Sequence, residues 1–245
     1  MMIMPHMIQE TITYSCRSCG STNIVKNGTN KCGNQQYHCH DCGVYRVLKP
    51  AKPEAHHDRE KALSAYRERV SLRGIARIFK ISRETFRKWL LSEIEQQPSL
   101  TETLQEAKVD DVLEVDEAWS FVQRKQEKRW LWTALCRRTG QIVAFVIGDR
   151  SEATCQRLWQ KIPDQYRHCR SYSDFWDAYQ AVFPAETHTA VSKKSGEVSH
   201  MERWYNTLRQ WLGRFTRKTL SFSKSDHYHE LVTRWFIIHY NLSCC

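Results

Sequence analysis

The sequence predicts a multi-domain protein with an N-terminal zinc ribbon, an all-α helix-turn-helix segment and a C-terminal α/β domain. Three observations predict it: two close cysteine pairs near the start, an apolar pattern of helical period in the next segment, and alternating strand-like runs followed by helical runs in the second half. The expected domains are a ribbon at 1–50, a helix-turn-helix at 51–97, a linker at 98–111 and the α/β domain at 112–245.

Charge and hydropathy narrow the class of partner. The chain has 37 Lys and Arg against 27 Asp and Glu, a net charge of +10, which favours a polyanion such as nucleic acid or anionic lipid. No apolar run approaches the roughly 20 residues that span a bilayer, and the first residues lack the charged and apolar regions of a signal peptide. We therefore expect a cytoplasmic protein with no membrane partner, in which cysteines are thiols or metal ligands.

The N-terminal cysteines have the spacing of a zinc ribbon. Two Cys-x2-Cys pairs are separated by nineteen residues, and a glycine that can take a tight turn follows each pair. The expected ligands of one zinc ion are Cys16, Cys19, Cys39 and Cys42. Four thiolates leave no open position for water, so the metal is expected to be structural and to supply folding free energy. The alternative is a redox or accidental pairing.

Residues 59–93 carry the apolar pattern of three short helices. Ser82 is a good N-cap, so a helix should begin near Arg83. In a helix-turn-helix this would be the recognition helix, whose N-terminal half contacts the major groove. The side chains expected there are Arg83, Glu84, Arg87 and Lys88. The alternative is a plain three-helix bundle with a solvated basic face.

The second half predicts a three-stranded antiparallel meander over 112–122, 129–136 and 141–147. A helix at 152–161, a short strand at 168–173, a helix at 175–183, a short strand at 187–191 and two long helices should follow. The order β-β-β-α-β-α-β-α is the ribonuclease-H-like order.

Three acidic residues stand where such a fold would bring carboxylates together: Asp116 within the first strand, Asp174 after the fourth, and Glu202 on a helix. Aspartate is a poor strand residue, so Asp116 needs a reason, and metal coordination is one. Carboxylate oxygens suit Mg²⁺, and two ions can flank a reacting phosphate. Each acid also has a simpler interpretation: an edge-strand charge, a helix N-cap and a solvated helix charge, respectively. The nearest rivals are Glu114, Glu117 and Asp177.

The helix expected at 199–215 has an apolar face, with Glu202 on a polar stripe beside it. From there to residue 224, cations alternate with aromatic residues, a pattern suited to DNA phosphates. The residues singled out for DNA binding are Arg209, Arg214, Arg217 and Lys218. The alternative is a buried face with a solvated basic rim.

These residues resemble the IS-one family of bacterial insertion-sequence transposases, of the InsA–InsB type with a DDE catalytic domain. The motifs that carry the resemblance are Glu114-Val115-Asp116-Glu117-Ala118-Trp119, Ser173-Asp174-Phe175-Trp176-Asp177-Ala178-Tyr179, Met201-Glu202-Arg203-Trp204-Tyr205-Asn206-Thr207-Leu208-Arg209-Gln210 and Leu220-Ser221-Phe222-Ser223-Lys224-Ser225. This chain departs from the family in two features. Phe175 stands where the family usually has a small residue, and the InsA-type and InsB-type parts form one continuous reading frame.

The resemblance implies that Asp116, Asp174 and Glu202 are a catalytic triad holding two Mg²⁺ or Mn²⁺ ions. It implies an enzyme that binds terminal inverted repeats, cleaves DNA and transfers the strand to target DNA, as a homo-oligomer associated with the bacterial nucleoid when bound. Two alternatives remain: a DNA-binding repressor with an inactive catalytic domain, and a hydrolytic nuclease of the same fold.

Overall fold

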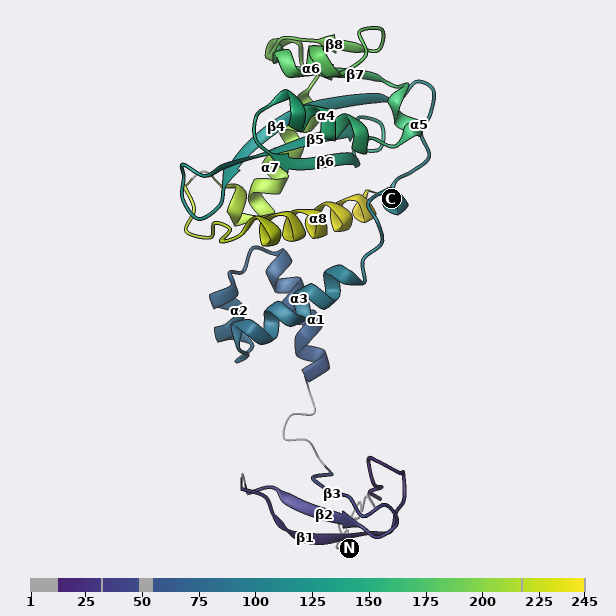
Figure 1. Cartoon of the computed structure of the whole chain (residues 1–245), viewed down its shortest axis with the longest axis vertical. Helices are drawn as coiled ribbons and strands as arrows, with labels where there is room; N and C mark the ends of the chain where they lie inside the picture. Colours follow the sequence, from purple (N-terminus) through teal and green to yellow (C-terminus); the bar gives the residue numbers. More distant parts are fainter. Residues whose placement is uncertain (1–12, 32, 49–54, 217, 245) are drawn as a thin grey trace, which may run out of the picture. The chain divides into compact units, whose positions relative to one another are not determined.

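The structure is a computed structural model of the chain. It describes residues 13–31, 33–48, 55–216 and 218–244. They fall into two compact units, Met1–Asp58 and Arg59–Cys245 (Figure 1). The helices expected to bind DNA therefore belong to the same unit as the C-terminal sheet.

The N-terminal unit is a three-stranded antiparallel sheet in the order β1-β2-β3. Its strands are β1 (Ile24–Thr29), β2 (Gln35–Cys39) and β3 (Tyr45–Arg46). Most side chains of β1 and β3 are exposed, so little apolar surface holds this sheet together.

Three short helices follow, as the apolar pattern predicts: α1 (Ala55–Arg67), α2 (Leu72–Ile78) and α3 (Arg83–Glu95). The Ser82 hydroxyl accepts a hydrogen bond of 2.9 Å from the Thr85 amide. The expected N-cap and helix start are both confirmed, because a serine oxygen satisfies an amide that the first turn leaves unpaired.

The C-terminal sheet is mixed, with the order β6-β5-β4-β7-β8. Its strands are β4 (Val112–Phe121), β5 (Lys128–Cys136), β6 (Ile142–Gly148), β7 (Arg170–Ser173) and β8 (His188–Ala190). The first three form the predicted antiparallel meander, and β7 and β8 run parallel to β4. This α/β arrangement is consistent with the ribonuclease-H-like order expected from the sequence.

The helices of this unit are α4 (Glu152–Lys161), α5 (Asp164–Arg167), α6 (Asp177–Val182), α7 (Ser199–Trp211) and α8 (Asp226–Ser243). The short helix α5 was not expected. Helix α7 ends before the predicted residue 215 because Leu212 is extended, and a separate 3-10 turn, Gly213–Phe215, follows.

The sheet has a hydrophobic cluster on each face. One cluster joins Leu113, Val115 and Trp132 to α4 and α6. The other joins Ala118 and Leu131 to α7 and α8, and continues into α1, α2 and α3. Figure 1 shows α7 and α8 on the side of the sheet toward the three helices. The three helices therefore share a core with the sheet domain.

Polar contacts reinforce this shared core. Arg214 donates to the Tyr66 hydroxyl at 2.7 Å, and the rings of Tyr66 and Trp235 stack with centroids 6.1 Å apart. In the part of the chain that the structure describes, no helix is long and apolar enough to cross a membrane.

Candidate active site and metal centres

The four N-terminal cysteines converge as the spacing predicts. Their sulfur atoms all lie within 4.8 Å of one another, and the Sγ–Sγ distance is 3.6 Å both for Cys16–Cys42 and for Cys19–Cys39. Thiolates about 2.3 Å from a central zinc would lie about 3.8 Å apart in a tetrahedron. The donor set and its size therefore fit one structural zinc ion.

The backbone of each cysteine pair is shaped to present its sulfurs inward. Gly20 and Gly43 donate to the carbonyls of Cys16 and Cys39 at 2.8 and 2.9 Å. Both glycines have left-handed φ values, 76° and 70°, which side chains disfavour. The Ser18 and Cys19 amides lower the pKa of the Cys16 thiol to about 6, whereas the neighbouring thiols raise the pKa of Cys19 and Cys42.

In the C-terminal unit, Asp116 of β4 comes together with Asp174, which directly follows the adjacent parallel strand β7. Glu114 of β4 pairs with Tyr172 of β7, so the same register, extended by two residues, sets Asp116 beside Asp174. Strand β4 is central in the sheet, so Asp116 is not an edge-strand charge. The N-cap position of α6 is Trp176, but the Asp174 carboxylate accepts the Trp176 amide at 3.1 Å.

The third carboxylate near this pair is that of Glu117. Oxygens of Asp116, Glu117 and Asp174 lie within 4.8 Å of one another, and Glu202 is not a member of this group. Carboxylate oxygens at such a spacing are the donor set that Mg²⁺ takes in proteins, so these residues fit a divalent cation. From the sequence, Glu202 was expected in this position, with Glu117 only as a rival.

The Glu117 carboxylate is already held by two side chains. Arg150 Nη2 lies 2.6 Å from Oε1, and the Tyr179 hydroxyl donates to Oε2 at 2.7 Å. Burial raises the pKa of Glu117, as does the charge of Asp174, whereas Tyr179 and Arg150 lower it. Arg150 in turn lies 3.9 Å from the ring centre of Trp176. The residues that contact Glu117 lie in the connection between β6 and α4 and in α6, so the sequence around Glu117 did not indicate these contacts.

Glu202 is exposed on α7, as its simpler interpretation predicted. Met201, its neighbour, is fully buried against the sheet, while Trp204 packs on Phe236 of α8 with ring centres 6.3 Å apart. Successive residues of a helix are rotated by about 100° about its axis, so Glu202 and Trp204, two residues apart, point in nearly opposite directions. Because Trp204 faces α8, Glu202 lies on the flank of α7 that faces away from α8. Helix α8 contacts β6, and β7 lies on the other side of β4. That flank is therefore on the side of β7, which leads into Asp174.

A buried carboxylate fixes the start of α7 against β4. Glu114 is fully buried, and its Oε1 lies 2.9 Å from Arg137 Nε and 2.7 Å from His200 Nδ1. Its Oε2 accepts the Met201 amide at 2.9 Å. These contacts set the register between the strand that carries Asp116 and the helix that carries Glu202.

The side chains expected on the recognition helix differ in solvent exposure and in their contacts with other segments. Arg83, Glu84 and Lys88 are exposed. Arg87 instead contacts Tyr228 of α8: its Nε donates to the hydroxyl at 3.1 Å, and its guanidinium carbon lies 4.5 Å from the ring centre. This interaction between distant segments was not predictable from the helix alone.

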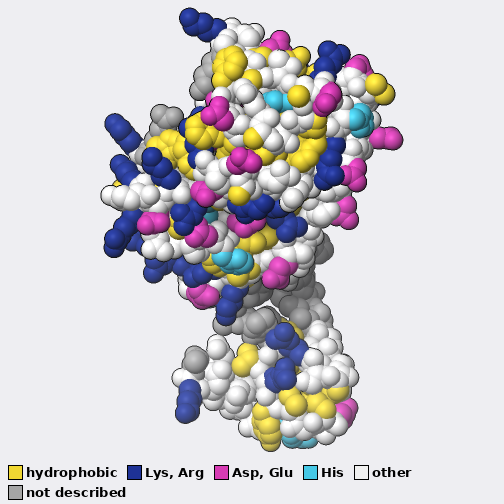
Figure 2. Space-filling model, turned by 45° about the horizontal axis from the view of Figure 1, so that its top comes forward, with side chains coloured by type: hydrophobic (Ala, Val, Ile, Leu, Met, Phe, Trp, Pro, Cys, Tyr) yellow, Lys and Arg dark blue, Asp and Glu magenta, His cyan; other side chains and the backbone are white. Residues whose placement is uncertain are grey.

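The cations expected after α7 also differ. Arg214 is part of the structure, because besides Tyr66 it donates to the Ser223 hydroxyl at 3.0 Å. Arg209 is half-exposed beside Asn206, Lys218 is exposed, and Arg217 lies outside the described residues. Figure 2 shows Lys and Arg side chains gathered along the left side of the larger unit.

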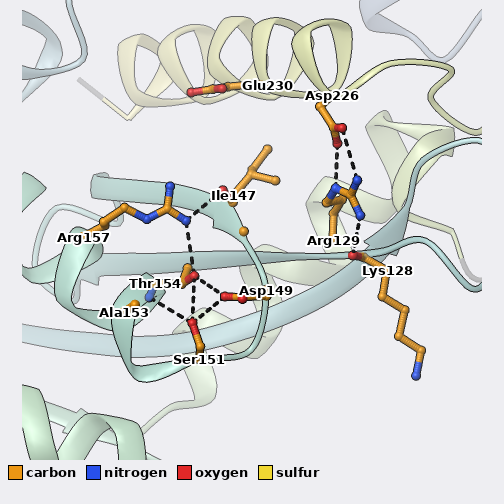
Figure 3. A pocket seen from close by; sticks show the side chains of 11 residues that line it. Lys128, Arg129, Ile147, Asp149, Ser151, Ala153, Thr154, Arg157, Asp226 and Glu230 are labelled. Atoms are coloured by element: carbon orange, nitrogen blue, oxygen red, sulfur yellow. Dashed lines mark hydrogen bonds and ion pairs between the residues drawn. The ribbon is translucent and has the colours of Figure 1, made fainter.

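A separate depression of about 430 Å³ lies between β5, β6, α4 and α8 (Figure 3). Its polar groups satisfy one another: Arg129 pairs with Asp226 at 2.6 Å, and the Thr154 hydroxyl bonds to Asp149. None of the clustered carboxylates lines it. It is therefore not part of the candidate active site.

Comparison with known proteins identifies the C-terminal half. A family model described as IS1 transposase matches residues 111–242. The InsB protein of insertion element iso-IS1n from Shigella dysenteriae is 34% identical over 128 residues, which is 51% of this chain and 93% of that protein. The InsB protein of IS1 4 from Escherichia coli strain K12 is 36% identical over 119 residues, 49% of this chain and 69% of that protein.

Among solved structures, the crystal structure of a pre-cleavage Mos1 transpososome aligns over 83% of this chain and 80% of that chain. The TM-score is 0.36 at 11% identity, which is too low to carry an argument. The family match covers more than half of the chain, and the alignment spans most of each InsB protein. The chain therefore belongs to the IS1 transposase family.

Proposed function

We propose that this transposase is a metal-dependent polynucleotidyl transferase that cleaves DNA at the ends of an insertion sequence and joins the freed 3′ ends to target DNA. The observation that carries this proposal is the meeting of Asp116, on β4, and Asp174, directly after the adjacent parallel strand β7, beside a third carboxylate. Clustered acids repel one another, so their conjunction is best explained by cations that they hold together.

The proposed catalytic ligands are Asp116, Asp174 and Glu202. Two Mg²⁺ or Mn²⁺ ions, when bound, would activate the attacking oxygen and stabilise the leaving oxygen. Asp116 and Asp174 hold them from the sheet, and Glu202 approaches from α7. Glu117 is a positioning residue in this proposal, because Arg150 and Tyr179 already occupy its two oxygens. Glu114 accepts a hydrogen bond from the Met201 amide and so fixes the first turn of α7 against β4, the strand that carries Asp116.

The N-terminal half supplies DNA binding. The four-cysteine ribbon holds a structural zinc ion, and α2 and α3 act as a helix-turn-helix at the terminal inverted repeats. Arg83 and Lys88 suit guanine or phosphate, and Glu84 suits cytosine. Arg87 can read a base only if its contact with Tyr228 breaks. Arg209, Arg217 and Lys218 contact phosphates. Arg214 would do so only where DNA binding releases it from Tyr66 and Ser223. The ribbon takes 1–50, the helix-turn-helix 51–97, the connection 98–111 and the catalytic part 112–245, and residues from Arg59 onward form one compact unit.

Joining two ends in concert requires two active sites, so we propose that a homo-oligomer assembles on DNA. The reaction is tested with the purified chain and a duplex carrying the genomic sequence that flanks its reading frame, with a supercoiled plasmid as target. We expect Mg²⁺-dependent nicking and strand transfer. Asp116→Asn and Asp174→Asn should abolish both while duplex binding survives, and Asp177→Asn, an exposed acid on α6, is the matched control.

The other candidate functions give different results in the same assay. Cleavage without transfer indicates a hydrolytic nuclease. Duplex binding by the unaltered chain without any cleavage indicates a repressor. Full activity of both Asp variants would show that the reaction takes place elsewhere.

A further inference from the structure

The turn between β4 and β5 is fastened to the connection between α7 and α8. Val122 and Ser223 form an isolated parallel bridge, and the Gln123 amide donates to the Ser223 carbonyl at 2.8 Å. The Gln123 side chain also donates to the Lys224 carbonyl at 3.2 Å. Gln123 has a left-handed φ of 62°, a conformation that a side chain disfavours unless its surroundings enforce it. These bonds make the two segments one fixed surface.

The connection is also anchored from within the unit. The Ser223 side chain is buried, and its hydroxyl lies 3.0 Å from Arg214 Nη1 and 2.8 Å from His229 Nδ1. The ring of Phe222 contacts Phe121 of β4, with centres 5.4 Å apart. The exposed side chains on either side of Ser223 therefore project from a rigid base.

Those exposed side chains are cationic. Arg124 and Lys125 lie at the tip of the β4–β5 turn, and Lys224 lies beside it. The neighbouring acids, Glu127 and Asp226, share Arg129, at 3.8 and 2.6 Å. Among the described residues, no ion pair engages the three cations at the turn. The turn and the connection lie at the left of Figure 1, the side on which Figure 2 shows cations gathered.

An apolar side chain lies four residues before Lys224 in the same connection. Leu220, in the same connection, is 98% exposed, so its side chain contributes nothing to the core. Proteins that bend duplex DNA insert leucine and similar residues between base steps, next to cations that hold the phosphates. Three exposed cations and an exposed leucine in the same connection as Lys224 fit that chemistry.

We propose that Arg124, Lys125, Lys224 and Leu220, here called the hairpin surface, form a further contact with duplex DNA, separate from α3 and from Arg209 and Lys218. Six residues along β4 separate Asp116 from Val122, or about 20 Å. A duplex that runs along β4 would meet this surface about six base pairs from the reacting phosphate, at about 3.4 Å per base pair. The inference rests on the proposed function, since it assigns part of the same DNA substrate.

The test measures binding of the full chain to a random-sequence duplex at several salt concentrations, which reports phosphate contacts without requiring the element's ends. The slope of log affinity against log salt should fall in magnitude by up to about 0.9 for each cation removed in an Arg124→Ala/Lys125→Ala/Lys224→Ala variant. The matched control removes three exposed cations elsewhere, Lys108, Lys161 and Arg170, and should leave the slope nearly unchanged.

Leu220→Ala should weaken binding about tenfold without changing the slope, because an apolar contact releases no counterions. Full exposure of Leu220 means that the variant should fold normally, which thermal unfolding checks. An unchanged slope in the triple variant, or an equal fall in the control, overturns the phosphate contacts. Unchanged affinity of Leu220→Ala overturns the apolar contact. If the unaltered chain binds no duplex at all, the proposed function fails instead.

Discussion

The two candidate metal centres are built on opposite principles. The four cysteines lie in a small sheet whose side chains are mostly exposed, so little besides a metal ion can hold the segment folded. The carboxylates lie on a sheet with a hydrophobic cluster on each face. A metal is therefore expected to be a folding component in the N-terminal unit and a reaction component in the C-terminal unit.

The largest expected effect is on folding of the N-terminal unit. Cys39→Ser, or removal of zinc by a chelator, should unfold it, because structural zinc contributes on the order of 10 kcal/mol in small domains. Zinc content should fall from about one ion per chain to none. All nine tryptophans follow residue 58, so tryptophan fluorescence should still report a folded C-terminal unit. A zinc-free chain with an ordered ribbon would contradict the comparison.

The next effect tests whether Glu202 or Glu117 is the third carboxylate ligand of the reacting ions. Glu202→Ala should lower Mg²⁺-dependent cleavage by about 10³-fold or more, because it removes a ligand of the reacting ions. Glu117→Gln should lower it only about 10- to 100-fold, as expected for a residue that acts through its neighbours. Glu202→Ala should leave the melting temperature in the absence of metal unchanged, because the side chain is exposed, whereas Glu117→Gln should lower it, because Arg150 loses its carboxylate partner. The reverse ranking would make Glu117 the ligand.

The stability of the C-terminal unit should depend on pH through His229. This ring is buried between the Ser120 and Ser223 hydroxyls, and burial lowers its pKa from 6.5 to about 3. Between those values the unfolded chain binds a proton that the folded chain excludes, so stability is lost as pH falls below about 6.5. The loss should reach about 3 kcal/mol at pH 4.

Urea unfolding followed by tryptophan fluorescence at pH 7 and pH 4 measures this loss within the C-terminal unit. His229→Gln should be less stable than the unaltered chain at pH 7 but should show a smaller difference between the two pH values. An equal difference in both proteins would show that other groups cause the acid sensitivity.

The smallest expected effect tests whether the three helices and the sheet unfold together. Tyr66→Phe removes the hydroxyl that accepts from Arg214 and should lower the free energy of unfolding by about 1 kcal/mol. A single urea transition should persist, because both parts share one core. Tyr45→Phe, in the N-terminal unit, is the matched control. Two separated transitions would show that the helices fold as an independent domain.

Much of the molecule could be predicted from the sequence because the deciding interactions are local. Ser82 caps a helix through an amide three residues away, and the antiparallel meander follows from its alternating apolar residues. Cysteine spacing predicts the four-thiol cluster because each pair is a short turn. Asp116 was notable as an acid within a strand, and the predicted order of elements placed it near Asp174.

Only the tertiary structure decided how the site and the DNA-binding residues are used. The contacts of Glu117 come from residues 33 and 62 positions away, and Arg87 meets a tyrosine 141 positions away. No local pattern carries such pairings, because a side chain's partners depend on which elements pack together. Residue types, turns and periods determined the elements and the candidate acids. Packing decided which carboxylate is held, which arginine is engaged and which flank of α7 carries Glu202.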